Sequence, residues 1–170
     1  MTKWLILGTL VSSAAGCSTR YAAMSPTASP SGARFLTFER VSGFVSSGYK
    51  LVLFDDGRLE YEGWGSGEKP SRDEVPIAPP AMAKVRSSLE RLSVLRPDCC
   101  NCGGATDQSG IFMTFQVPGG TNTKKIDHYE ACAKTPDWLF DVENEIDDAL
   151  GTERWIGKKV VGKPHHPDQL

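Results

Sequence analysis

Residues 49–64, YKLVLFDDGRLEYEGW, alternate apolar and polar side chains on both sides of the dipeptide Asp56-Gly57. A period of two residues is typical of a strand that buries one face. Aspartate followed by glycine tolerates the positive φ angles of a two-residue hairpin turn. This stretch therefore predicts a β-hairpin. The positions that share its apolar face are Tyr49, Leu51, Leu53, Leu59 and Tyr61.

Strand-like alternation returns in three other segments. FLTFER at 35–40 precedes the hairpin, and IFMTFQV at 111–117 and KKIDHY at 124–129 flank a turn rich in Pro and Gly. These segments predict one strand before the hairpin and two after it. Residues 64–79 are rich in Gly, Pro and charge, which predicts a connecting loop.

Two segments instead have the period of an amphipathic helix, 79–95 and 135–150. In the second, Thr135 is a candidate N-cap and Pro136 suits the first helical position. The predicted order is β-β-β-α-β-β-α, an α+β fold in which a small antiparallel sheet carries two helices packed on one face. The apolar stripes are Met82, Val85, Leu89 and Leu92, then Leu139, Val142, Ile146 and either Ala149 or Leu150.

The first 16 residues have the order of a secretory signal. Lys3 precedes an apolar run over 4–11, and small residues then lead to Cys17. The run is much shorter than the ~20 residues of a membrane-spanning helix, which favours recognition and cleavage over a permanent span.

The segment Ala14-Ala15-Gly16-Cys17 resembles the lipobox of bacterial lipoproteins, with Ala14 where leucine is usual. The resemblance implies cleavage before Cys17, acylation of its thiol with groups such as palmitate, and anchoring in the cell envelope. Ser18, in place of aspartate, implies the outer membrane, with the domain facing the periplasm. The alternative is plain secretion after cleavage at a small residue.

These features divide the chain into four parts. Residues 1–16 are the expected signal peptide, and 17–33 are the lipidated N-terminus and a flexible tether poor in apolar residues. Residues 34–157 form a single α+β domain, and 158–170 are a polar C-terminal tail. The formal net charge of −2 and the absence of a recognisable nucleic-acid motif argue against a nucleic-acid partner.

The chain from about residue 35 to 157 resembles a widespread bacterial envelope domain of unknown function. The segments that carry the resemblance are FLTFER, GYKLVLFDDGRLEYEG, Thr106-Asp107 and PDWLFDVENEIDDALGTERWIG. The resemblance implies the same α+β fold and no activity. Family members often have a Cys-x-Gly-x-Cys-Pro segment where this chain has Ser42 and Ser46, so that cysteine pair is absent here.

Four cysteines remain once Cys17 is assigned to lipid. An even number of cysteines in an exported domain is typical of structural disulfides. A bond between the neighbours Cys99 and Cys100 would force a strained ring, so we expect Cys132 to pair with one of them and Cys102 with the other.

Two other interpretations of the cysteines stay open. Cys99 and Cys102 have C-x-x-C spacing, and His128 with Cys132 could complete a zinc site. Cys99 and Cys102 could also be a redox dithiol, although the βαβ setting of such motifs is missing.

Other candidate residues are less specific. The acidic run on the second predicted helix indicates a solvated face, or else a patch for a basic partner or cation. Trp64, between glycines, is either an exposed recognition residue or a lid on the core. For an enzyme, Asp107 and His128 are the leading candidates. His165 and His166 in the tail could bind copper or zinc. The acids of the helix are Asp137, Asp141, Glu143, Glu145, Asp147 and Asp148.

The sequence therefore predicts a lipid-anchored envelope protein whose domain binds another protein or an envelope component. No residue is assigned to catalysis, a cofactor or a metal. The alternatives are an envelope enzyme, such as a hydrolase with an unrecognised site, and a cysteine-based metal or redox sensor.

Overall fold

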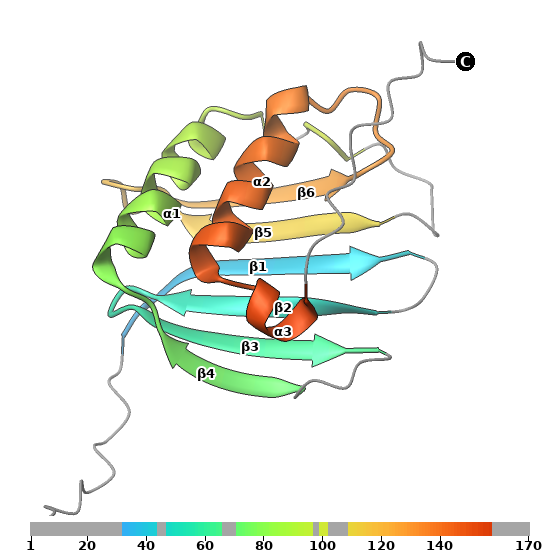
Figure 1. Ribbon diagram of the computed structural model, residues 1–170. Coiled ribbons are helices and arrows are strands. Elements are labelled where there is room, and N and C mark those ends of the chain that lie inside the picture. The colour runs from blue at the N-terminus through green and yellow to red at the C-terminus, as the bar shows by residue number, and fades with distance from the viewer. Residues whose placement is uncertain (1–31, 44–46, 66–70, 97–98, 102–108, 158–170) are drawn as a thin grey trace, which may run out of the picture. The chain divides into compact units, whose positions relative to one another are not determined.

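The computed structural model describes residues 32–43, 47–65, 71–96, 99–101 and 109–157 (Figure 1). Its described part has one antiparallel sheet with the strand order β4-β3-β2-β1-β5-β6. Helices α1 and α2 lie side by side over one face of that sheet, so the predicted α+β class is confirmed. The elements are β1 (Arg34–Ser42), β2 (Ser47–Phe54), β3 (Arg58–Trp64), β4 (Arg72–Pro76), α1 (Pro79–Ser93), β5 (Gly110–Gln116), β6 (Thr123–Tyr129), α2 (Asp137–Leu150) and α3 (Glu153–Ile156).

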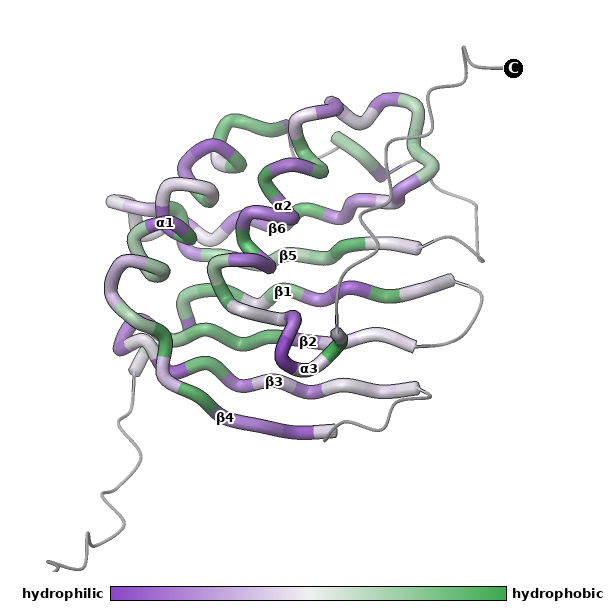
Figure 2. Tube along the Cα trace, viewed as in Figure 1, coloured by the Kyte–Doolittle hydropathy of each residue, from purple (hydrophilic) through white to green (hydrophobic). Residues whose placement is uncertain are grey.

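The core lies between the sheet and the two helices. Every strand except the edge strand β4 points alternate residues towards the helices. This arrangement is visible as alternating hydropathy along the strands (Figure 2). Burying each large apolar side chain of this kind contributes about 1.5–3 kcal/mol. The sheet side of the core comprises Leu36, Phe38, Tyr49, Leu51, Leu53, Leu59, Tyr61, Ile111, Met113, Phe115 and Ile126.

The helices bury the stripes that their sequence predicts. Helix α1 ends where the Lys124 ammonium donates hydrogen bonds to the carbonyl groups of Ser93 and Leu95, which satisfies acceptors at the helix C-terminus. Helix α2 ends at Gly151, whose φ of 66° is in the left-handed region that glycine tolerates. No helix in the described part of the chain is long and apolar enough to cross a membrane.

The structure differs from the prediction in four places. Strand β4 occupies part of the predicted loop over 64–79, and it pairs with β3 although only Val75 of its residues is partly buried. The hairpin turn has three residues, 55–57, with Gly57 at φ 86°. Helix α2 begins at Asp137, and Pro136 rather than Thr135 is its N-cap. Helix α3 adds one further turn that places Trp155 on the core.

Candidate functional site

The sheet face opposite the helices is not covered by any described helix or loop, and we call it the open face. Strand register brings one side chain from each strand into a continuous row across it. From β6 to β4 the row changes from an ammonium group to two hydroxyl groups, then to one apolar side chain and two carboxylates. Its neighbours along the strands are mainly polar. Its members are Lys125, Thr114, Thr37, Val52, Glu60 and Glu74.

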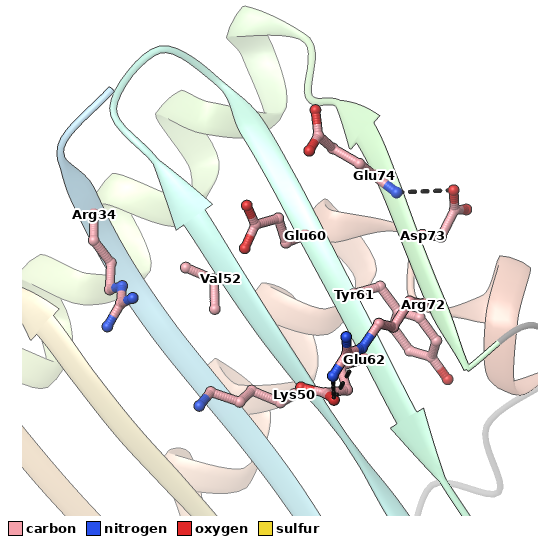
Figure 3. Close-up of a pocket in the computed structure, with 9 residues that line it drawn as sticks. All are labelled: Arg34, Lys50, Val52, Glu60, Tyr61, Glu62, Arg72, Asp73 and Glu74. Atoms are coloured by element: carbon pink, nitrogen blue, oxygen red, sulfur yellow. Dashed lines mark hydrogen bonds and ion pairs between the residues drawn. The ribbon is translucent and has the colours of Figure 1, made fainter. Parts of the chain in front are cut away.

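One groove of about 510 Å³ lies over strands β2, β3 and β4, and we call it the mixed groove (Figure 3). Val52 is 9% exposed and lies among the charged side chains that line the groove. Arg72 donates hydrogen bonds to Glu62 over 2.7 and 3.2 Å. That hydrogen bond, with the Arg72 charge and a smaller effect of Lys50, lowers the pKa of Glu62.

The other two glutamates of the mixed groove, Glu60 and Glu74, also have a cationic neighbour. The Arg58 guanidinium, which lies on the Phe54 ring, donates to Glu60 and approaches Glu74 at 3.4 Å. Surface pairs of this kind add little stability, but they fix where charge is neutralised. The negative charges of the three glutamates in this groove are thus paired with arginines of the same sheet.

A second groove of about 420 Å³ extends from β2 across β1 and β5 to β6, and we call it the cation groove. It adjoins the mixed groove, because Arg34 and Lys50 line both. No carboxylate is among the described residues that line it. Its lining consists of Arg34, Phe35, Thr37, Lys50, Thr114, Phe115, Gln116 and Thr123.

A buried polar cluster lies on the other side of the sheet, under α2. Asp147 is fully buried and accepts hydrogen bonds from the Tyr49 hydroxyl at 2.6 Å and the Arg40 guanidinium at 3.0 Å. Burial, and secondarily the Asp147 charge, raises the pKa of Tyr49. For Arg40, burial lowers the pKa, but the carboxylates around it, with Asp147 first, outweigh this and leave the pKa raised. The partly buried Arg40 guanidinium and the fully buried Asp147 carboxylate therefore form an ion pair under α2.

His128 and Glu143 form the second half of this cluster. Both side chains are fully buried, and the histidine Nδ1 lies 2.8 and 3.0 Å from the two carboxylate oxygens. Burial raises the pKa of Glu143, against the opposing effect of the His128 hydrogen bond. The histidine ring packs edge-on against Phe140, and its Nε2 has no hydrogen-bond partner among the described residues. Neither residue lines a described groove, so the pair joins β6 to α2 away from solvent.

The predicted cysteine pairing is wrong at Cys99 and Cys100, which are bonded to each other with an S–S distance of 2.13 Å. The expected strain of such a ring does not prevent the bond, because a turn there gives Cys100 a φ of 73° and brings the adjacent sulfurs together. Cys132 is also disulfide-bonded. In this oxidised state these three sulfurs are unavailable as zinc ligands.

Several predicted site residues lie outside the described residues. They include the lipidation candidate Cys17, and also Cys102 of the cysteine cluster. No group of three potential ligands that could hold a metal ion occurs among the described residues. Also outside the described residues are Ser46, Thr106, Asp107, His165 and His166.

The acidic run of α2 is not a simple solvated face. Glu143 and Asp147 are fully buried, and Glu145 pairs with Arg91 of α1 at 2.7 Å. Of the remaining acids, Asp141 is one of those exposed to solvent. The patch available to a basic partner is therefore smaller than the sequence indicates.

Trp64 lies at one end of the open face and is 38% exposed. A Cβ added to Gly48 would come within 2.8 Å of its ring, so the indole lies against the glycine backbone of β2. Phe112 and Tyr129 pack edge to face on strands β5 and β6. Trp64 is therefore a partly exposed aromatic residue of the open face and not a lid on the core.

Sequence reasoning identified His128 as a site candidate but missed Arg40, Tyr49 and the grooves. Arg40 could have been found, because it continues the inward alternation of Leu36 and Phe38. The grooves depend on the pairing of β1 with β5, which local patterns do not reveal. A comparison with protein families, curated proteins and solved structures found no family model, no curated protein and no solved structure that matches the chain.

Proposed function

We propose that this protein is a lipid-anchored lipoprotein of the bacterial envelope whose domain binds an envelope component through the open face of its sheet. The observation that carries the proposal is the one-sided construction of the domain. Helices cover one sheet face, whereas the opposite face presents two adjoining grooves. Concave sites with a few convergent polar groups are the usual places for ligands.

The buried polar cluster also supports the open face as the binding surface, because the cluster itself is not accessible to a ligand. His128, Glu143 and Asp147 are fully buried, so their polar groups contact other side chains of the domain rather than a substrate. The mature N-terminus expected at Cys17 places the anchor on the chain just before β1, whose first residue, Arg34, lines both grooves. The proposed tether therefore joins the domain at the rim of its proposed binding face.

The first experiment tests anchoring in the bacterium that makes the protein. The full chain should incorporate labelled palmitate and sediment with outer membranes. Cys17→Ser should abolish labelling and release the protein from the membrane fraction, because the thiol that accepts the acyl chain is gone. Palmitate labelling that survives Cys17→Ser would contradict the proposed anchor.

The second experiment tests which face binds. A photo-cross-linking amino acid is placed at exposed Thr114 on the open face or, as the matched control, at exposed Asp141 on α2. In intact cells, Thr114 should give discrete adducts with an envelope protein, lipid or glycan, and Asp141 should not. Equal adducts from both positions, or none from Thr114, would contradict binding through the open face.

A further inference from the structure

The cation groove contains two positive charges and no carboxylate among its described lining residues, which favours an anionic ligand. Arg34 and Lys50 line it from β1 and β2, and neither makes an ion pair with any described residue. Their charged ends reach over β1 in the same view (Figure 3). The two residues that line both grooves are thus cations that have no ion-pair partner among the described residues.

Neighbouring carboxylates do not remove this charge. The Lys50 charge helps to lower the pKa of Glu62, but Glu62 accepts its hydrogen bonds from Arg72. Glu39 is the cross-strand neighbour of Lys50, yet it makes no ion pair with it and lines neither groove. An oxyanion in the groove would therefore meet two cations without displacing an existing ion pair.

The rest of the cation groove is uncharged and, apart from the buried Phe35 and Phe115, polar. Thr37, Thr114 and Thr123 supply hydroxyl groups and Gln116 supplies an amide, each able to donate and accept hydrogen bonds. Such groups match the hydroxyls of a polyol better than an apolar ligand body. The planar fork of Arg34 suits bidentate binding of a phosphate, and the Lys50 ammonium acts as a point charge beside it.

We propose that the cation groove binds a phosphorylated polyol or sugar, with the phosphate between Arg34 and Lys50 and the hydroxyls along the threonines. This inference rests on the proposed function, because it assigns a ligand class to the open face. The same chemistry occurs in a soluble polyol phosphate and in a phosphoglycerol lipid headgroup. The two sources are separated by experiment.

The test uses the full chain carrying Cys17→Ser, so that no acyl group holds it on a vesicle. Glycerol 3-phosphate, inorganic phosphate and glycerol are titrated into the protein by calorimetry. Glycerol 3-phosphate should bind more tightly than phosphate, and glycerol should not bind. Co-sedimentation with phosphatidylglycerol vesicles forms the second arm. Binding only to vesicles would assign the lipid source, and binding to soluble glycerol 3-phosphate would assign the soluble one.

Variants decide whether the groove is responsible. Arg34→Ala and Lys50→Ala should each weaken binding about tenfold, the loss expected for one charge-assisted contact. Lys125→Ala is the matched control, because it removes one cation from the same face outside the groove and should change affinity less than about twofold. Thr114→Val should weaken binding of glycerol 3-phosphate but not of inorganic phosphate.

Three outcomes would overturn the inference: no binding in either arm, binding that survives Arg34→Ala and Lys50→Ala, or an equal loss with Lys125→Ala. Circular dichroism of each variant confirms that it is folded. If phosphate ligands fail while Thr114 still gives face-specific adducts in cells, the ligand class is wrong and the proposed function stands. If the adducts are also missing, both fail.

Discussion

Replacing Asp147 with alanine removes the acceptor that Arg40 and Tyr49 share. The carboxylate is fully buried, and it accepts a 2.6 Å bond from the tyrosine hydroxyl and a 3.0 Å bond from the guanidinium. Removing one member of a buried ion pair costs about 3–5 kcal/mol, because the other charge is left without a partner. Arg40 is not left wholly unpaired, because its side chain keeps 24% exposure and also lies 3.7 Å from Glu130 and 3.5 Å from the amide oxygen of Asn144. We therefore expect a loss near the lower limit, about 3 kcal/mol.

Urea unfolding of the full chain, followed by far-ultraviolet circular dichroism, measures this loss. With a slope of about 2 kcal/mol per M, the midpoint should fall by about 1.5 M. Asp141→Ala is the control on the same helix, where the carboxylate is exposed and the change should stay within about 0.5 kcal/mol. Tyr49→Phe combined with Asp147→Ala should show a coupling energy of about 0.5–3 kcal/mol. A loss below about 1 kcal/mol for Asp147→Ala, or additive effects, would refute the reasoning.

Three further predictions follow from other features. Burial raises the pKa of Glu143, so above the ordinary glutamate value of about 4.3 the folded state keeps a proton that the unfolded state has lost, and this group's contribution to stability falls as pH rises. Glu143→Gln should flatten that slope in unfolding free energies measured between pH 4 and 7, and an unchanged slope would contradict it. Gly48→Ala should lower the free energy of unfolding by about 1–3 kcal/mol, because the added Cβ would lie 2.4 Å from a backbone oxygen. In the control Gly120→Ala, the added Cβ meets nothing closer than 3.6 Å. Equal melting curves for the two variants would count against this prediction. Non-reducing peptide mapping should find Cys99 bonded to Cys100, and a bond from either to a distant cysteine would disagree with the structure.

Most of the fold could be predicted because its elements have regular periods. The hairpin and both helices have apolar residues at most positions that face the core, and the polar exceptions on the helices are Ser88, Glu143 and Asp147. Strand β4 could not be predicted this way. Val75 is its only partly buried residue, and the strand is held by backbone pairing to β3. An edge strand of this kind has no period to detect.

The buried polar cluster was partly visible in the sequence. Glu143 and Asp147 are four residues apart and lie within the stripe formed by Leu139 and Leu150, so their spacing placed them on the inner face of α2. Acidic side chains are rarely buried without partners, which favoured the solvated interpretation. Their partners come from β1, β2 and β6, and only the assembled sheet brings these strands under the helix.

The two edge strands limit how this sheet can associate. Strand β4 carries Arg72, Asp73 and Glu74 in succession, and β6 carries Lys124, Lys125 and Asp127. Charged side chains on an edge oppose the addition of a strand from another chain. If the proposed anchor concentrates many copies on one membrane, this property lets them crowd together without joining their sheets into larger assemblies. Each domain would then remain a separate unit with its grooves accessible.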